Sequence, residues 1–415
     1  MIYSDVLPGV PRVLARVELV DSLHTADRLL AELHQGSSRA GTGRARGSGV
    51  MPGDLGGFAL RLDGLWPAEA QWFTVHAARL RPVTGQGPLG TACLVSGSPS
   101  RLIRVGHDFI HSLDGRRQAD WQNALQPALE FLAGRRPQTW QIRQGAVPLE
   151  NRTVVMGILN VTPDSFSDGG RYLDPAAALD HAQAMAETGA SIIDVGGEST
   201  RPGSEPVTAE EEWNRLAPVL KRLVPHVGVP VSIDTYKAEV ARRALDLGVH
   251  IVNDVSGLAD PAMAATVREA GAGLVIMHNA RRADYQDLMT EVAWFLRSRL
   301  AAARQAGIDD AYVVLDPGLG FAKEAEHNFL LMRRLAALVS LGRPVLVGPS
   351  RKRMIGKVLG TGPDDRLEGT AALVALCAWM GASIVRVHDV AEMSRVARML
   401  DAVRNQVWEV AADGR

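Results

Sequence analysis

Lysine is scarce in this sequence, although basic residues in general are not. Of the 45 lysine and arginine residues, lysine accounts for five, at Lys221, Lys237, Lys323, Lys352 and Lys357. Arginine is therefore the default cation of the chain. Because lysine carries a compact ammonium and arginine a planar fork, a lysine at a candidate site indicates that the site needs a point charge.

Cysteine is almost absent as well. Cys93 and Cys377 stand far apart, with no CxxC pair and no cluster of cysteine and histidine. This excludes a disulfide framework and argues against a structural zinc site. The first residues lack a basic segment followed by a long apolar one, so no signal peptide is expected. Both features predict a protein of the reducing cytoplasm.

The chain has no excess of charge and no long apolar run. Its 45 basic and 46 acidic residues leave a net charge of -1, which gives no reason to expect nucleic acid or a membrane as a partner. The longest apolar stretch, residues 371–385, is interrupted by Gly381 and Ser383 and is too short to span a bilayer. With 46% hydrophobic and 22% charged residues, the composition is that of a globular chain.

From about residue 153 onward, short apolar runs alternate with longer amphipathic segments. The strand-like runs cover residues 154–159, 191–195, 230–233, 250–252, 273–277, 311–315, 344–347 and 383–387. The helical patterns cover residues 176–188, 209–223, 238–247, 288–306, 324–339, 367–380 and 390–403. Eight strand-like runs with helical patterns between them predict an α/β fold, a (β/α)8 TIM barrel over residues 150–410. A doubly wound open sheet is the alternative.

Polar side chains stand at the end of every strand-like run. They are Asn160, Asp194, Asp234, Asn253 with Asp254, His278, Asp316, Ser350 with Lys352, and Arg386 with His388. In a barrel the carboxyl ends of the strands meet at one mouth, where the active site lies. An Asp or Asn after a strand is also a common helix cap or turn former. Capping does not explain the histidines, Lys352 or Arg386, so the set predicts a functional site.

Residues 1–145 predict a separate, smaller α+β or α/β domain, whose role the sequence does not disclose. Helical patterns cover residues 25–34, 68–80, 99–113 and 121–132, and strand-like runs cover 58–62 and 92–95. Residues 35–50 are rich in Gly, Ser and Arg and are expected to form a flexible loop.

The segment of residues 156–170 carries the strongest motif. A strand ends at Asn160, and a polar loop follows that contains Phe166 and Asp168 and closes on two glycines. A polar loop with one aromatic side chain is suited to an active-site lid. An ordinary solvated loop would leave Phe166 without a role.

This run resembles the signature of the dihydropteroate synthases, which are pterin-binding TIM-barrel enzymes. The other segments similar to the family's motifs are GGESTRPG at 196–203, SIDT at 232–235, NDVSG at 253–257, DPGLGF at 316–321, SRK at 350–352 and RVHD at 386–389. Each alone is a weak signal, but the ordered set is specific. Residues 1–145 lie outside the resemblance and form an N-terminal extension.

The resemblance implies a transferase of folate biosynthesis. In this reaction 6-hydroxymethyl-7,8-dihydropterin pyrophosphate loses pyrophosphate with the help of Mg²⁺, and the amine of 4-aminobenzoate attacks the exocyclic carbon by an SN1-like route. The resemblance places Asn160 on the Mg²⁺ and the pyrophosphate, with Arg201, Arg386 and His388 as a pyrophosphate clamp. An amide oxygen suits a metal that keeps most of its waters, and an Arg fork suits phosphate. A surface arginine and a structural histidine are the plain alternatives.

The pterin pocket implied by the resemblance contains Asp234, Asn253, Asp316, Lys352 and Met277. The pterin amino and ring N–H groups need acceptors, which Asp316 and Asn253 supply, and its carbonyl needs a donor such as Lys352. Such paired recognition is selective because a wrong ligand leaves buried polar groups unpaired. Met277 fits an ordinary core position equally well.

The 4-aminobenzoate pocket implied by the resemblance is lined by Phe166, Thr200, Pro202, Phe321 and Ser350. The catalytic residues carried over from the family are Asp234, Lys352, Asn160 and Asp168. After the fifth strand the sequence departs from the family's usual Met-Gly-Pro continuation, which puts the shape of that loop in doubt. Family members are commonly homodimers, and the apolar helix expected at 367–380 is a candidate surface for such pairing.

Three other interpretations compete with a synthase. A methyltetrahydrofolate-dependent methyltransferase would share the pterin carboxylates but would need no pyrophosphate clamp. A barrel aldolase would use Lys352 as a Schiff-base nucleophile, which ignores the other motifs. A non-catalytic pterin-binding protein would have no use for the clamp and both loops.

Overall fold

The computed structural model describes residues 13–20, 57–80, 82–161, 174–199, 205–280 and 283–406. By its contacts the chain divides into two compact units. One comprises Met1–Arg136 together with Asp284–Ser298 and Ala336–Gly342, and the other comprises Pro137–Ala283, Arg299–Leu335 and Arg343–Arg415. The helix expected over residues 25–34 and the loop expected over 35–50 lie outside the described residues.

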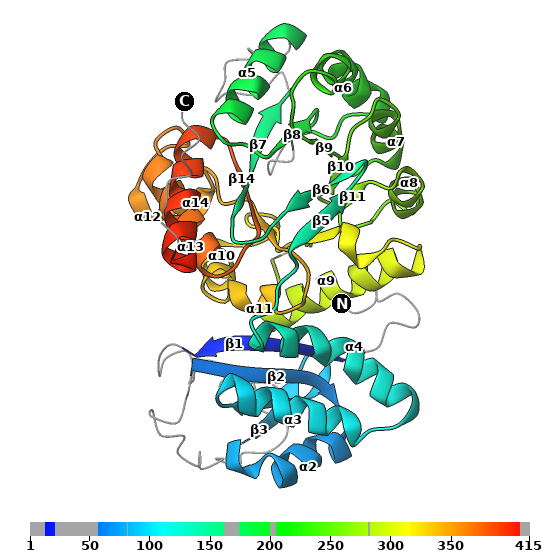
Figure 1. Ribbon diagram of the computed structural model, residues 1–415, viewed down its shortest axis with the longest axis vertical. Coiled ribbons are helices and arrows are strands. Elements are labelled where there is room, and N and C mark those ends of the chain that lie inside the picture. Colours follow the sequence, from blue (N-terminus) through cyan, green and yellow to red (C-terminus); the bar gives the residue numbers. More distant parts are fainter. Residues whose placement is uncertain are drawn as a thin grey trace. The chain divides into compact units, whose positions relative to one another are not determined.

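The first unit is built on an antiparallel sheet in the order β1-β2-β4-β3. Its strands are β1 (Leu14–Val20), β2 (Gly57–Leu65), β3 (Val83–Gly87) and β4 (Gly90–Ser96). Its helical segments are α2 (Pro67–His76), the 3-10 turn η3 (Ala78–Leu80), α3 (Pro99–His111) and α4 (Gly115–Leu132). Figure 1 shows α3 and α4 beside this sheet, and Phe109 of α3 packs edge-on against Trp121 of α4 at 5.4 Å.

A buried ion network occupies one face of this sheet. Arg16 lies opposite Arg61 in the register of β1 and β2, so the two side chains share a face with Glu18 and Asp63. Arg16 donates to Glu18 at 2.8 Å and to Asp63 at 3.0 Å, and Arg61 donates to Asp63 at 3.1 Å. Arg61 also donates at 2.6 Å to Asp287, which belongs to the same unit. Arginines so fully buried persist only when paired.

The second unit is a closed parallel barrel. Its strands are β7 (Val154–Asn160), β8 (Ile192–Gly196), β9 (Val231–Asp234), β10 (Ile251–Asp254), β11 (Gly273–Met277), β12 (Val313–Asp316), β13 (Leu346–Val347) and β14 (Ile384–Val387). The sheet order is β12-β11-β10-β9-β8-β7-β14-β13, and a parallel bridge from Leu315 to Val345 closes the ring. This closure confirms the predicted TIM barrel and excludes the open sheet.

Helices follow the strands in sequence and surround the ring, as Figure 1 shows for α5 to α8. They are α5 (Pro175–Glu187), α6 (Ala209–Leu223), α7 (Ala238–Asp246), α8 (Met263–Ala270), α10 (Ala325–Arg333), α12 (Arg353–Leu359), α13 (Leu367–Trp379) and α14 (Val390–Asn405), with the 3-10 turn η5 (Asp310–Tyr312) before β12. Two further helices, α9 (Leu288–Gln305) and α11 (Leu335–Val339), also lie between strands in the sequence, but Asp284–Ser298 and Ala336–Gly342 belong to the first unit. No helix in the described part of the chain is long and apolar enough to cross a membrane.

Local chemistry sets the helix ends. The Thr208 hydroxyl accepts from the Glu211 amide at 3.2 Å at the start of α6, where three glutamates fill the first turn and a Lys-Arg pair the last. The expected single helix over 324–339 is wrong. The chain leaves the helical region at Arg334, whose φ is -108°, and α10 and α11 are separate. Likewise the helix expected over 68–80 ends at His76 and continues only as η3.

A two-stranded hairpin packs against the amino ends of the barrel strands. It consists of β5 (Thr139–Ile142) and β6 (Gly145–Pro148). The Trp140 and Ile142 side chains share one buried cluster with residues from the starts of the strands, among them Ile251 and Ile384. The Trp140 indole donates to the Tyr312 carbonyl at 2.8 Å. The hairpin therefore closes the end of the barrel opposite the polar strand ends.

Candidate active site

The carboxyl ends of the barrel strands carry polar side chains at adjacent positions. Asn160 ends β7, Asp234 ends β9 and Asp316 ends β12, while Asn253 is the penultimate residue of β10. Because the strands are parallel and the ring is closed, these ends meet at one mouth. The register of β9 and β10 places Asp234 beside Asn253 directly.

Arg386 on β14 joins two acidic side chains, Asp194 in the middle of β8 and Asp234 at the end of β9. Its Nε donates to Asp194 at 2.6 Å and its second guanidinium nitrogen donates to Asp234 at 2.7 Å. The Asn253 amide donates to the same Asp194 oxygen at 3.0 Å. Asp194 is fully buried, Asp234 is 9% exposed and the Arg386 side chain is 20% exposed. One guanidinium is thus shared by two buried carboxyl groups, so the group carries a net negative charge only when both of them are ionised.

Both carboxylates retain an unused acceptor. Asp194 Oδ1 and Asp234 Oδ1 are buried and have no hydrogen-bond donor among the described residues. A buried acceptor without a donor costs about 1–3 kcal/mol. These oxygens are therefore well suited to a ligand that brings N–H groups or positive charge into the mouth.

Burial shifts the protonation of the acids at the mouth. Loss of solvent raises the pKa of Asp234 from 3.8 to about 7, with Arg386 opposing the rise and Asp194 adding to it. Loss of solvent also raises the pKa of Asp316 to about 6, against the Gly318 amide and nearby cations. Carboxyl groups poised near neutrality in a barrel mouth are typical of functional sites.

Among the cations that lower the pKa of Asp316, Lys352 has the largest effect. Burial lowers the pKa of Lys352 to about 8, while Asp316 opposes that shift. The Lys352 ammonium lies 4.8 Å from the centre of the Phe321 ring. Gly320 has φ +80°, and a Cβ there would approach the Lys352 stem at 3.3 Å, so glycine leaves this path open.

Ser350 and His388 form a second polar pair at the mouth. The Ser350 hydroxyl lies 3.0 Å from His388 Nδ1 and also accepts from the His388 amide at 3.2 Å. The neighbouring Arg351 instead points to Asp389 and forms two hydrogen bonds at 2.6 and 3.1 Å. Ser350 is therefore held at the base of the segment that presents Lys352.

The comparisons with known proteins agree with this geometry. Residues 156–388 match the family described as pterin binding enzyme. The Bacillus subtilis dihydropteroate synthase is 47% identical over 270 residues, which make up 65% of this chain and 95% of that protein.

Solved dihydropteroate synthases are similar in structure too. The Xanthomonas albilineans enzyme with 4-aminobenzoic acid has 44% identity and a TM-score of 0.60, over 64% of this chain and 96% of that one. The Thermus thermophilus enzyme in complex with 6HMPPP has 41% identity and a TM-score of 0.57, over 65% and 100%.

This chain belongs to the dihydropteroate synthase family. The match begins at residue 156, so Met1–Arg136 of the first unit lie outside the segment that the family accounts for.

The structure places ten of the residues expected from the family at or beside the barrel mouth. They are Asn160, Asp234, Asn253, Met277, Asp316, Phe321, Ser350, Lys352, Arg386 and His388. Asp168, Phe166, Thr200, Arg201 and Pro202 lie outside the described residues. Met277 is 2% exposed, at the end of β11. Arg386 and His388 were both expected to bind pyrophosphate. In the structure Arg386 forms hydrogen bonds to Asp194 and Asp234, and His388 forms hydrogen bonds to Ser350.

Two groups of residues at the mouth were not predicted from the sequence as site residues. One is Asp194, whose position at a strand end was noted but given no role. The other is a set of lysines: Lys323 lies 2.8 Å from His278, and Lys237 pairs with Glu212 at 2.5 Å and with Glu198. The scarcity of lysine could have indicated these residues as site residues, because Lys237, Lys323 and Lys352 are three of the five lysines in the chain.

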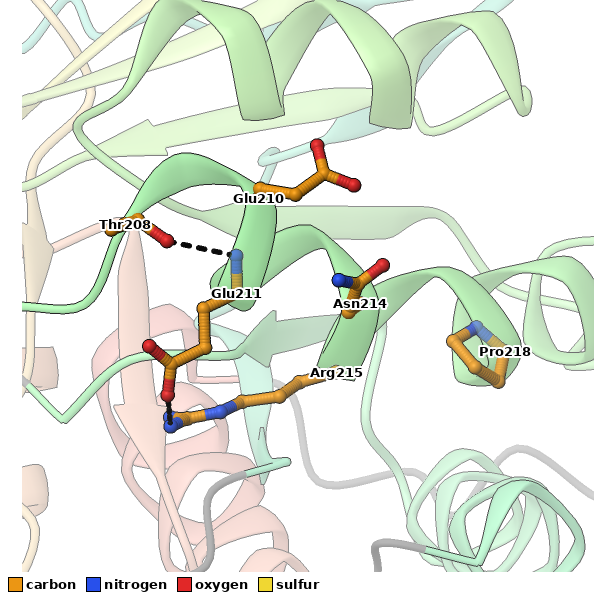
Figure 2. A pocket seen from close by; sticks show the side chains of 6 residues that line it. All are labelled: Thr208, Glu210, Glu211, Asn214, Arg215 and Pro218. Carbon is orange, nitrogen blue, oxygen red and sulfur yellow. Dashed lines mark hydrogen bonds and ion pairs between the residues drawn. The ribbon is translucent and has the colours of Figure 1, made fainter.

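A hollow on the outside of the barrel is unrelated to this mouth. Figure 2 shows Thr208, Glu210, Glu211, Asn214, Arg215 and Pro218 along the exposed side of α6. Glu211 and Arg215 pair within the helix at 2.5 Å, and none of the strand-end residues lines the hollow. The hollow therefore does not compete with the mouth as the candidate site.

The raised pKa of Asp234 predicts a pH-dependent stability. Folding favours protonated Asp234, so this contribution is complete below an unfolded pKa near 3.8 and is lost as pH rises through about 7. The Asp234→Asn variant lacks this loss. Between about pH 5 and pH 8, the unfolding free energy of wild type should therefore fall relative to that of Asp234→Asn, as measured by urea denaturation.

Asp246→Asn, an exposed acid on α7, is the matched control and should follow wild type at both pH values. Parallel pH dependences for Asp234→Asn and wild type would contradict the assignment of a raised pKa to Asp234.

Proposed function

We propose that this chain is a dihydropteroate synthase. It joins 6-hydroxymethyl-7,8-dihydropterin pyrophosphate to 4-aminobenzoate and releases 7,8-dihydropteroate and pyrophosphate. A carbon–nitrogen bond forms at the exocyclic carbon, the carbon–oxygen bond to pyrophosphate breaks, and the amine loses one proton. The observation that carries the proposal is the cluster of Asp194, Asp234, Asn253, Asp316 and Lys352 around Arg386 at the mouth of a family-matched barrel.

The mouth offers the polar pattern that a pterin ring requires. The ring presents amino and N–H donors on one edge, and Asp316 on β12 and Asn253 on β10 supply acceptors from the two strands that flank β11. The Lys352 ammonium supplies the donor for the ring carbonyl and nitrogen. Asn253 and Asp316 are buried and Lys352 is half-buried, which makes an unmatched ligand costly.

The unused oxygens of Asp194 and Asp234 suit the charge that develops during the reaction. Departure of pyrophosphate leaves positive charge on the pterin, and Asp194 and Asp234, once both are ionised, carry one negative charge more than Arg386 neutralises. Preorganised charge of the opposite sign is the efficient way to stabilise such a species. This favours an SN1-like route in which the carbon–oxygen bond breaks before the amine of 4-aminobenzoate attacks.

The leaving group and Mg²⁺ belong at the Asn160 side of the mouth in this proposal. In the described parts of the chain, no three His, Cys, Asp or Glu side chains are placed so that they could hold a metal ion together. The residues therefore fit an ion held mainly by pyrophosphate oxygens and water, with the Asn160 amide oxygen as the protein ligand. When bound, Mg²⁺ would neutralise charge on the leaving pyrophosphate. Arg201, Arg386 and His388 are proposed to bind the pyrophosphate oxygens.

The remaining assignments rest on the sequence motifs. Phe166, Thr200 and Pro202 are proposed to line the 4-aminobenzoate pocket with Phe321 and Ser350, and Asp168 is proposed to act in the first loop. Their support is the order and spacing of the family motifs in which they lie.

We further propose that the protein is a cytoplasmic homodimer. Cys93 and Cys377 are both free and buried, which suits a reducing compartment. Large apolar side chains are exposed on the adjacent helices α13 and α14, with Trp379 58%, Met399 63% and Val403 52% exposed. An apolar patch of this kind marks a protein contact more often than free surface.

Product formation tests the synthase directly. With Mg²⁺, dihydropterin pyrophosphate and 4-aminobenzoate, wild type should release pyrophosphate and dihydropteroate in equal amounts. Asn160→Ala should lower kcat about 10²–10³-fold by removing a transition-state contact. The control Asn214→Ala, exposed on α6, should match wild type. Pterin binding without either product would sink the enzyme assignment and favour methyl transfer or a binding role.

Mass in solution tests the dimer. Trp379→Arg should convert the sedimentation coefficient from that of a dimer to that of a monomer, because a charge in an apolar contact is left desolvated. The same substitution at exposed Val75, in the first unit, should leave the mass unchanged. A monomeric wild type would refute the proposal.

A further inference from the structure

A buried pair of basic side chains lies at the mouth without a role in the reaction described above. Lys323, in the segment after β12, lies with its Nζ 2.8 Å from Nδ1 of His278, which follows β11. Lys323 is 8% exposed and His278 is 1% exposed. Two basic groups are buried in contact only when one of them is neutral and accepts a hydrogen bond from the other.

His278 is the neutral partner. Burial, and then the charge of Lys323, hold the pKa of His278 well below its usual value. An ammonium has donors only, so His278 Nδ1 accepts and the ring proton sits on Nε2. Burial lowers the pKa of Lys323 to about 7, with Asp316 opposing this shift and Lys352 adding to it. Among the described residues, the ionisable groups that act on Lys323 are Asp316, Lys352 and His278.

Lys323 ties the loop after β12 to the end of β11. Its ammonium donates to the Phe321 carbonyl at 3.0 Å and lies 3.4 Å from the His278 carbonyl. The His278 amide in turn donates to the Asp316 carbonyl at 2.8 Å. A Cβ at Gly318, where φ is +68°, would lie 2.1 Å from the His278 carbonyl oxygen, so the two segments are in close contact.

The same ammonium acts on the candidate pterin acceptor through space. Burial raises the pKa of Asp316, and among the charges that oppose the rise Lys323 comes after Lys352 and before Arg386. A pterin N–H needs the ionised carboxylate as its acceptor. Lys323 therefore influences both the loop that carries Phe321 and the charge of Asp316.

We propose that Lys323, held by His278, is a positioning residue of this site: it fixes the 316–323 loop and supports Asp316 as the acceptor for the pterin edge. The inference rests on the proposed function and goes beyond it, because neither side chain is assigned to either substrate. Lys323 acts through Asp316 and Phe321 and does not itself touch the reacting atoms.

Lys323→Met tests the proposal, because it keeps the length of the side chain and removes its charge and donors. The KM for dihydropterin pyrophosphate should rise about 10- to 100-fold. The acid limb of kcat/KM for this substrate should also move to higher pH, since Asp316 without its neighbouring cation takes up a proton sooner. Lys357→Met, an exposed lysine paired with Glu326 at 2.8 Å, is the matched control. It should change neither quantity.

Lys323→Arg and His278→Gln complete the test. Arginine keeps the charge, so the acid limb should stay at the wild-type pH while KM rises less than in Lys323→Met. His278→Gln keeps an acceptor, and combined with Lys323→Met it should add little, because the pair acts as a unit. A stable Lys323→Met protein with wild-type KM and an unmoved acid limb would overturn the proposal, as would full additivity of the two changes.

Failure of the proposed function would be visible separately. If wild type bound dihydropterin pyrophosphate without forming dihydropteroate, the synthase assignment would fall. The dissociation constant for the same pterin, measured by calorimetry for wild type and Lys323→Met, would still decide the role of Lys323. Equal constants would reject it.

Discussion

The ion group of Arg386 with Asp194 and Asp234 is the interaction on which the mouth of the barrel depends. It joins three strands, β8, β9 and β14, through hydrogen bonds of 2.6 and 2.7 Å. Removing the guanidinium would leave two buried carboxylates repelling each other, a change that typically costs several kcal/mol. The same arrangement leaves one oxygen of each carboxylate unused. Stability and readiness for a cationic ligand therefore come from one set of side chains.

The rest of the barrel serves to hold this group in a dry setting. The ring closes through the Leu315–Val345 bridge, and the hairpin β5–β6 fills the opposite end with Trp140 and Ile142. This packing keeps water out of the barrel on the side of the strand ends that faces the hairpin. Burial then raises the pKa of Asp234 and Asp316 into the range of physiological pH. A carboxyl group left at the surface would not be shifted in this way.

Much of the barrel could be predicted from the sequence, because strand runs covered on both faces are continuously apolar and each ends in a polar residue. All eight strands lie where their apolar runs predicted them. The short helices α8 and α12 and the hairpin β5–β6 were missed, since segments of four to eight residues carry too little periodicity. In the first unit, β1 was missed because it alternates apolar residues with the charged Arg16 and Glu18, which are buried only through pairing.

The site was predictable residue by residue but not as a network. Motif order identified Asp234, Asn253, Asp316 and Lys352, yet no spacing in the sequence indicates that Arg386 bonds to Asp194. Such contacts join residues about 190 positions apart and follow only from the closure of the ring. The Lys323–His278 pair spans only 45 positions and joins the segments that follow two consecutive strands, β11 and β12. Lysine scarcity marks the residue, but its partner comes from another strand end.

Proton release on pterin binding is the most direct test of the central claim, that buried carboxylates of raised pKa become ionised acceptors for the pterin. The ligand is 6-hydroxymethyl-7,8-dihydropterin without pyrophosphate, so that phosphate ionisation does not contribute. Calorimetry in two buffers of different ionisation enthalpy gives the number of protons exchanged. The account predicts release at about pH 6 that fades towards pH 8, as Asp234 and Asp316 lose their protons unaided. Binding with no proton release at the lower pH would contradict it.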